Sequence, residues 1–289
     1  MNTTAFGLVV TGALLHAIWN LCAKKASGGL PFVWLFGIVS LVVSFPFGWV
    51  AWSEHAHQLS FQAWVAIAAS AVVHGGYSLV LQKGYRESDF SIVYPLARGT
   101  GPLFAVLGAI IVLGEAPSLR GWLGILSILT GIFLISGAAQ ALLVPSPTAR
   151  AGLLWGAITG LFIAGYTVID GWAIKALGIA PVLYYVLVLA LRTAMLAPQA
   201  LRNPDSLRTQ WSANGRYIVA VGVLSPLAYV LVLFALTIAP LSYVAPVREL
   251  SMLLGVLFGA KLLRESFSLS RGIGTACMVA GVVLLAGIQ

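Results

Sequence analysis

Long apolar runs, separated by short groups of charged residues, prolines and glycines, follow one another along the whole chain. A helix needs about 20 mostly apolar residues to cross a membrane. The runs of about this length predict ten membrane-spanning helices with no extramembrane domain between them. They lie at residues 5–23, 30–52, 61–82, 90–113, 121–143, 152–174, 179–200, 217–239, 242–262 and 272–288.

The second half of the chain repeats the first. Shifting the sequence by 150 positions places residues 91–137 on residues 241–287. Unrelated apolar helices share leucines and valines by chance, but they rarely share a charged residue within a span and several glycines at one offset. The most informative matches are Arg98 with Arg248, Glu115 with Glu265, Gly124 with Gly274, Gly131 with Gly281 and Gly137 with Gly287.

Ten spans in two equivalent halves give five spans per half. Because five is odd, the second half must enter the membrane from the side opposite to the first. The predicted fold is an all-α polytopic membrane protein with ten transmembrane helices in two inverted five-helix repeats. The repeats are expected at 1–143 and 152–289, with a linker at 144–151. Inverted repeats are the architecture of many secondary transporters, which bind their cargo near the membrane midplane between the halves.

Composition agrees with a membrane protein and excludes other classes. Of the 289 residues, 60% are hydrophobic and 8% are charged, whereas soluble domains have about 25% charged residues. A soluble enzyme, a disordered chain and a disulfide-rich secreted module are therefore excluded. The net charge of +8 is spread over the loops, which is typical of cytoplasmic loops and forms no nucleic-acid-binding patch. Cys22 and Cys277 lie far apart in apolar runs and are expected to be buried thiols.

Arg98 and Arg248 lie within predicted spans, where an unpartnered charge costs about 2.5–3.5 kcal/mol. Arg98 lies about 12 Å into its helix, and Arg248 lies about equally deep in the repeat. Each arginine either binds an anionic group of a substrate or holds a proline-broken helix by donating to freed backbone carbonyls. The adjacent Glu249 points about 100° away from Arg248, so we expect it to pair with another helix.

Polar and aromatic side chains share faces of several predicted helices, which indicates a lined cavity. His16 and Asn20 lie four residues apart in the first span, and Ser70 and His74 have the same spacing in the third. A single histidine on an apolar face is usually a core residue, but two on polar faces favour a cavity. The residues expected to line a substrate site are His16, Trp19, Asn20, His74, Tyr77, Tyr94, Arg98, Tyr166, Tyr229 and Arg248. The bends about which helices move are expected at Pro95, Pro102, Pro226 and Pro246.

The sequence contains no catalytic pattern. It has no nucleophile elbow, no His-Glu-x-x-His and no P-loop, so we expect neither an enzyme nor direct use of ATP. No cofactor or metal is expected. One alternative places His16 and His74 as axial ligands of a haem, which requires the first and third helices to face each other at one depth. Another alternative is a receptor or accessory subunit that senses a ligand without moving it.

The chain resembles the EamA-type, ten-helix members of the drug/metabolite transporter superfamily over essentially its whole length. The resemblance rests on residues 16–20 (HAIWN) with Lys24, residues 94–99 (YPLARG) with Gly101 and Pro102, residues 245–249 (APVRE) and residues 263–265 (LRE). It implies a carrier of the cytoplasmic membrane that works by alternating access and commonly exports amino acids or related metabolites. It also implies cytoplasmic termini, whereas the loop charges place the termini outside, so the two indications of orientation disagree.

The first predicted helix departs from the related small multidrug carriers. Those carriers exchange protons for organic cations through a glutamate in this helix, and here His16 and Asn20 occupy its polar face without any carboxylate. Two deep arginines and two histidines favour a small solute with at least one negative group, such as an amino acid. A multidrug or organic-cation exporter is the alternative.

The sequence thus predicts a multi-pass transporter in the inner membrane of a bacterium that exports a small, partly anionic metabolite. Its expected partners are this small-molecule substrate and membrane lipid, with no nucleic acid. Because one chain contains both halves, a monomer suffices and a homodimer is compatible with the sequence.

Overall fold

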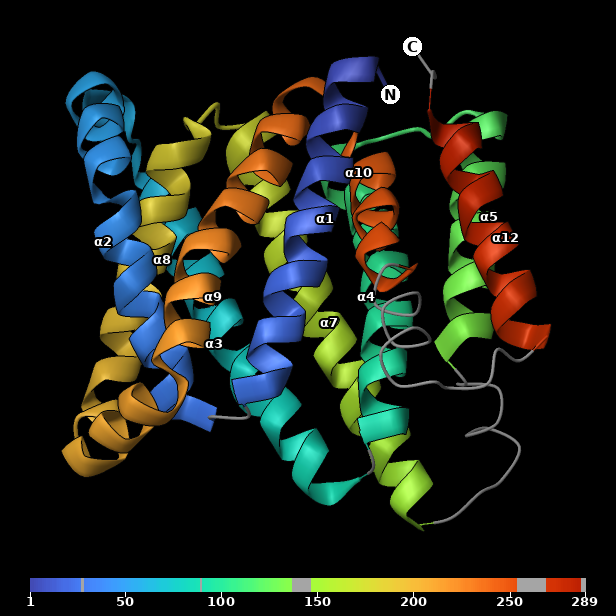
Figure 1. Cartoon of the computed structure of the whole chain (residues 1–289). Coiled ribbons are helices and arrows are strands. Elements are labelled where there is room, and N and C mark those ends of the chain that lie inside the picture. The colour runs from blue at the N-terminus through green and yellow to red at the C-terminus, as the bar shows by residue number, and fades with distance from the viewer. Residues whose placement is uncertain (27–28, 89, 137–146, 254–268, 287–289) are drawn as a thin grey trace.

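The computed structural model describes residues 1–26, 29–88, 90–136, 147–253 and 269–286. Within these residues the chain forms α-helices and one short 3-10 helix, η1 (Ala56–Gln58), and the predicted all-α class is confirmed. The α-helices are α1 (Thr3–Ala26), α2 (Gly29–His55), α3 (Phe61–Glu87), α4 (Phe90–Leu113), α5 (Leu119–Ser136), α7 (Pro147–Lys175), α8 (Pro181–Ala200), α9 (Pro204–Ile238), α10 (Leu241–Arg248) and α12 (Leu269–Leu285), as labelled in Figure 1.

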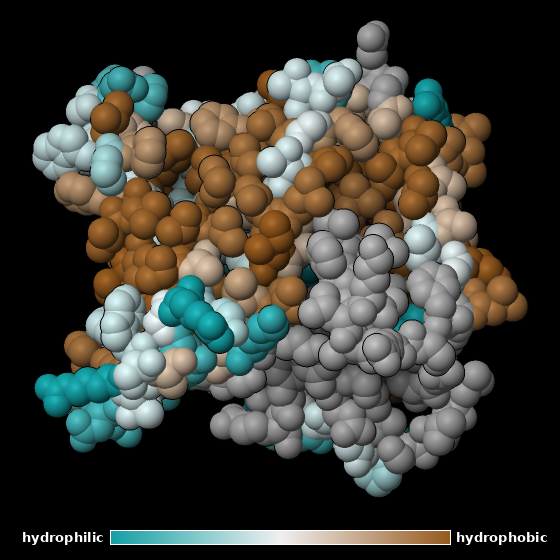
Figure 2. Space-filling model, viewed as in Figure 1, coloured by the Kyte–Doolittle hydropathy of each residue, from teal (hydrophilic) through white to brown (hydrophobic). Residues whose placement is uncertain are grey.

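The helices have the length and apolarity of membrane spans. Among the described residues, seven helices are long and apolar enough to cross a membrane, and α5 and α12 are shorter apolar helices. Figure 2 shows a broad hydrophobic belt across the described part of this face, with hydrophilic residues gathered toward its edges. Since lipid chains are apolar, large exposed side chains such as Phe47, Phe61 and Ile111 are expected on the outside of such a bundle.

The two halves have opposite directions. In Figure 1, α1 runs downward from the N-terminus, whereas α7, the first helix of the second half, runs upward. Met1 lies beside the end of α12, where its amino group donates to the Leu285 carbonyl at 3.4 Å. The structure therefore confirms the inverted repeat predicted from the odd number of spans per half.

The core lies between the halves, because their helices interleave. Close packing joins α1 with α9, α3 with α7, α4 with α7, and α5 with α12. The pairs α1–α9 and α7–α3 correspond to each other under the repeat, as do α2–α9 and α8–α3. A residue on an inward face of one half thus meets residues of the other half.

The paired glycines of the repeat bring α5 and α12 together. A Cβ atom on Gly131 would lie 2.5 Å from the Gly274 carbonyl oxygen, and one on Gly281 would lie 2.6 Å from the Gly124 oxygen. Only glycine allows the two backbones this close. The hydroxyl of Ser127 also donates to the carbonyl of Cys277 at 2.7 Å, and both cysteines are half-buried free thiols.

Two helix boundaries differ most from the sequence-based prediction. The helix expected at 217–239 begins earlier, at Pro204, because Asn203 caps its N-terminus by accepting from the Ser206 amide at 3.0 Å and its first turns are polar. The span expected at 242–262 is interrupted: α10 ends at Arg248, Glu249 forms a turn and helix resumes at Leu250. Residues 254–262 of that span lie outside the described residues.

Pro246 weakens α10 close to the point where it is interrupted. Pro246 has no amide hydrogen to donate and therefore cannot bond back along the helix. Two residues after Arg248 the helical hydrogen-bond pattern restarts, and at the break the Glu249 amide donates to the Pro246 and Val247 carbonyls. The break fixes the directions of two neighbouring charged side chains in the middle of the bundle.

Candidate functional site

One buried carboxylate lies between two arginines that the repeat makes equivalent. Glu249, at the break after α10, is 3.3 Å from Nε of Arg98 on α4 and 3.8 Å from Nε of Arg248. The side chains of Glu249, Arg248 and Arg98 are 1%, 7% and 12% exposed. We call these three residues the arginine–glutamate cluster. The expectation that Glu249 reaches another helix is confirmed, since Arg98 belongs to the other half.

Arg98 also reaches side chains of two further helical segments. Its Nη2 donates to Nε2 of His16 on α1 at 3.2 Å and to the hydroxyl of Ser251 at 3.1 Å. Because Nε2 of His16 accepts, its ring is the neutral tautomer with the proton on Nδ1. Its edge contacts the Trp19 ring with centroids 4.7 Å apart. The first-helix residues predicted for the site thus contact Arg98 or its neighbours.

Asn20 has a local role in this structure. Its side-chain amide donates to the backbone carbonyl of His16 at 2.8 Å, one turn earlier in α1. This bond occupies one of the two amide hydrogens and leaves the carbonyl oxygen as an acceptor. Asn20 therefore lies one turn after His16 and helps to hold the turn that carries it.

A second buried carboxylate joins four helices. Asp170 on α7, 1% exposed, accepts hydrogen bonds from Ser70 on α3 at 2.6 Å, from Tyr184 on α8 at 2.6 Å and from Tyr229 on α9. The three hydroxyl donors satisfy both oxygens of this buried carboxyl group, which would otherwise lack partners at this depth. The sequence predicts Ser70 on a polar face and Tyr229 in the substrate site, but it does not indicate that Asp170 connects them.

Aromatic rings surround this carboxylate. His74 stacks on Tyr166 with centroids 4.0 Å apart, and Tyr229 packs edge-on against His74 at 6.0 Å and beside Tyr185 at 5.9 Å. We call these four residues the aromatic cluster. Tyr77, another predicted site residue, packs edge-on against Tyr166 at 6.0 Å. Nδ1 of His74 lies 3.0 Å from the Ser70 carbonyl, to which it donates.

The charges of the arginine–glutamate cluster act on the aromatic cluster. The charge of Arg248 lies within electrostatic range of Tyr166, Tyr229, His74 and Asp170. The two groups of residues are therefore parts of one polar region between the halves. The predicted site residues described by the structure all belong to it: His16, Trp19, Asn20, His74, Tyr77, Arg98, Tyr166, Tyr229 and Arg248.

The predicted hinge prolines lie within helices. Pro226 is buried inside α9, and Pro246 lies two residues before the end of α10. Pro102 is buried in α4. The side chains of Tyr94 and Pro95 lie outside the described residues, although the backbone of both is part of α4.

Sequence reasoning missed four residues of this region, namely Ser251, Tyr184, Tyr185 and Arg192. An arginine inside a predicted span is a clear signal, and Arg192 lies between the predicted limits 179 and 200. Unlike Arg98 and Arg248, it has no charged partner at the repeat offset of 150. The tyrosines had no such signal, because aromatic residues are common in spans.

No group of three metal-binding side chains occurs among the described residues. Nε2 of His16 faces a guanidinium, and the His74 ring is covered by Tyr166. Both environments are unfavourable for axial ligation of a haem iron.

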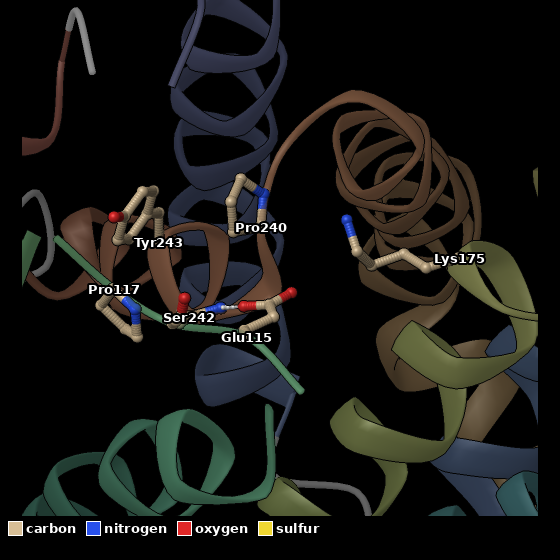
Figure 3. Close-up of a pocket in the computed structure, with 7 residues that line it drawn as sticks. Glu115, Pro117, Lys175, Pro240, Ser242 and Tyr243 are labelled. Carbon is tan, nitrogen blue, oxygen red and sulfur yellow. Dashed lines mark hydrogen bonds between the residues drawn. The ribbon is translucent and has the colours of Figure 1, made fainter. Parts of the chain in front are cut away.

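A separate pocket of about 170 Å³ opens where the α4–α5 connection meets the start of α10 (Figure 3). There Glu115 accepts from the backbone amides of Leu241 at 2.7 Å and Ser242 at 2.8 Å, which caps α10. Lys175 lies across the pocket and donates to the Ala239 carbonyl at 2.9 Å. This pocket lies at the opposite end of α10 from Arg248.

Comparisons with known proteins agree with the fold. The EamA-like transporter family matches residues 3–137 and 150–287. Among solved structures, 29 chains match, and one described as "Crystal structure of protein" superposes with a TM-score of 0.70 over 98% of this chain and 96% of that chain, at 16% identity. At this identity the likeness shows the fold alone. The comparison with curated proteins gives no match.

Proposed function

The chain belongs to the EamA-like transporter family, and from this premise we propose that it carries a small, partly anionic metabolite across the membrane. The cargo has at least one carboxylate or similar acidic group, as an amino acid does. It binds between the two halves and crosses by alternating access. The membrane is the cytoplasmic membrane of a bacterium, the direction is export, and one chain is the functional unit.

The arginine–glutamate cluster carries this proposal. Two guanidiniums share one carboxylate, so the cluster keeps one net positive charge although all three side chains are almost fully buried. An uncompensated charge at membrane depth costs about 2.5–3.5 kcal/mol. An acidic group of the cargo would remove this cost, and a guanidinium offers it two parallel donors. Nε of Arg248, which makes no hydrogen bond to the described residues, is one available donor.

The surroundings support transport. The cluster joins α4 of the first half to α10 of the second, so a ligand bound there contacts both halves. Discontinuous helices at the midplane are typical of transporter binding sites, and α10 is interrupted at Arg248. Pro102, Pro226 and Pro246 supply points in α4, α9 and α10 at which a helix bends with little cost in hydrogen bonds.

An organic-cation exporter is the second candidate, and Asp170 with its tyrosines is the observation that favours it. A carboxylate flanked by aromatic rings attracts cations. However, both oxygens of Asp170 already accept hydroxyl hydrogens from three helices. A cation that binds Asp170 would have to displace these hydroxyl donors. An anion that binds at Arg98 and Arg248 would not have to displace them.

Ligand-induced stabilisation of the purified protein tests the choice. The probes are L-amino acids, small carboxylates, phosphonates and organic cations, each added to the wild type, to Arg248→Gln and to Arg202→Gln, whose exposed side chain makes it the matched control. A probe at 100 times its dissociation constant stabilises the fold by about 2.7 kcal/mol. We expect an acidic probe to stabilise the wild type and Arg202→Gln but not Arg248→Gln.

Other outcomes contradict the proposal. Stabilisation by organic cations alone would assign the site to Asp170 and the second candidate. Transport of the stabilising probe into or out of liposomes is the companion measurement. A probe that binds and is never transported would indicate a receptor.

A further inference from the structure

The start of α10 is held by a carboxylate from the other half. Pro240, the residue before α10, has no side-chain oxygen that could cap the helix. The first amides of the helix would therefore lack acceptors. Glu115 supplies both acceptors, since one of its oxygens accepts from Leu241 at 2.7 Å and the other from Ser242 at 2.8 Å. Its charge also meets the positive end of the helix dipole.

The backbone that carries Glu115 is fixed by the end of α4. Gly114 has a φ of 66°, which turns the chain after Leu113. The Glu115 amide then donates to the Ala109 carbonyl at 3.2 Å, six residues earlier. Helices that end on a glycine commonly make this bond. The carboxylate is thus presented by a structured helix end of the first half.

Another hydrogen bond joins the same two segments. Oη of Tyr243, in α10, accepts from the Ser118 amide at 3.2 Å. A Cβ atom on Gly121 would lie 2.5 Å from this oxygen, so Tyr243 packs directly against the first turn of α5. Three hydrogen bonds therefore hold the α4–α5 connection against the start of α10.

A cation holds the other flank of the α9–α10 connection, which consists of Ala239 and Pro240. Lys175, at the end of α7, donates to the carbonyls of Ala239 at 2.9 Å and Leu236 at 3.4 Å. A positive charge there meets the negative end of α9. Figure 3 shows Pro240, Glu115 and Lys175 around the pocket of about 170 Å³. The connection thus has open space beside it.

α10 links this contact to the arginine–glutamate cluster. All eight residues of α10 are buried, and eight helical residues span about 12 Å. Directly after its far end, Glu249 lies 3.3 Å from Nε of Arg98. Both ends of α10 are therefore held to the first half by charged groups. Alternating access requires the halves to separate at one edge of the membrane at a time, and at this edge Glu115 joins them.

We propose that Glu115 is the gating residue at the edge of the bundle where α10 begins. Its carboxylate holds the α9–α10 connection while this edge is closed, and the connection moves away from the start of α5 when the edge opens. The inference rests on the proposed function, because it assumes alternating access. It does not depend on which cargo binds at Arg98 and Arg248.

Distances between two spin labels on the purified full-length protein test the gate. The labels are attached to Leu119→Cys at the start of α5 and to Thr237→Cys near the end of α9, both at exposed positions. Cys22 and Cys277 are replaced by alanine, so that no other thiol is labelled. Loss of a helix cap changes a two-state ratio about five- to thirtyfold. Glu115→Ala is expected to raise the population at a longer distance, relative to the shorter one, by this factor.

Matched variants identify the contact that is responsible. Glu115→Gln keeps one acceptor oxygen and should give an intermediate population at the longer distance. Tyr243→Phe removes the acceptor of the Ser118 amide and should also raise this population, so the test does not depend on the folding of one variant. Glu54→Gln removes an exposed carboxylate and should match the wild type.

The outcomes separate this inference from the proposed cargo. Distances that stay unchanged in Glu115→Ala and Tyr243→Phe would overturn the gate and leave Glu115 as a helix cap alone. An equal increase in Glu54→Gln would also overturn it, because loss of any carboxylate would then loosen this edge. Both results would leave anion binding at Arg248 intact. Failure of every acidic probe to bind would refute the proposed cargo without changing these distances, which are measured in its absence.

Discussion

Replacing Glu249 by glutamine should destabilise the protein more than replacing either arginine that it neutralises. The substitution keeps the shape of the side chain and removes its charge. Arg98 and Arg248 are then left as two guanidiniums, 12% and 7% exposed, with no carboxylate between them. Removing one partner of a buried ion pair costs about 3–5 kcal/mol, because the other charge stays buried and unpaired.

Thermal unfolding in one detergent measures this loss. A change of 1 kcal/mol shifts the melting temperature by about 2–4 °C in a chain of 150–250 residues, so we expect Glu249→Gln to melt about 6–20 °C below the wild type. Glu54→Gln is the matched control, since Glu54 is exposed and its loss should leave the melting temperature unchanged.

A double-mutant cycle identifies the cause. Arg98→Gln leaves Glu249 paired with Arg248, so it should cost less than Glu249→Gln. The double variant Arg98→Gln/Glu249→Gln removes one of the two unpaired charges and should be more stable than Glu249→Gln alone. If Glu249→Gln melts like the wild type, or if the double variant is the least stable of the three, the charge argument is refuted.

Three further predictions concern other contacts, all measured by the same unfolding assay. Asp170→Asn should lower the free energy of unfolding by about 2–4 kcal/mol, because three hydroxyls lose the carboxyl group that they share as acceptor. Tyr184→Phe should cost less, and the reverse order would contradict the central role of Asp170. Gly131→Ala should lower the free energy of unfolding by about 1–3 kcal/mol, because its Cβ would meet the Gly274 carbonyl. Gly215→Ala, with open space around it, should leave this free energy unchanged. Equal effects of the two substitutions would count against close packing of α5 on α12. Glu115→Ala should cost about 1–2 kcal/mol by uncapping α10, and no loss would show that another group satisfies those amides.

The sequence predicted the helices and their inverted order well, because span length and a repeat at a fixed offset are local properties of the chain. It also predicted that Arg98 and Arg248 occur at corresponding depths. It did not predict which helix faces meet, because a polar face on one helix indicates its inward side but not the helix that it contacts. The partners of Asp170 come from α3, α8 and α9, up to 100 residues away, and no periodic pattern connects them.

The break in α10 shows a different limit of sequence reasoning. Pro246 was a predicted bend, but α4 passes Pro102 and remains helical from Phe90 to Leu113, whereas α10 ends two residues after Pro246. A proline permits a break, and the packing around the helix decides whether it occurs. α10 ends directly before Glu249, and the carboxylate of Glu249 lies 3.3 Å from Nε of Arg98.

The positive charge of the arginine–glutamate cluster follows from one difference between the halves. At the repeat offset of 150, Arg98 corresponds to Arg248, but Glu249 corresponds to Gly99. The first half therefore contributes an arginine without a carboxylate, and the second half contributes both. A glutamate at each position would have given two neutral pairs, and a glycine at each would have left two buried charges with no counter-charge. One glutamate stabilises the two guanidiniums close together and still leaves a net positive charge for an acidic cargo to neutralise. The difference between the halves, rather than their symmetry, therefore determines which charge the centre of the protein attracts.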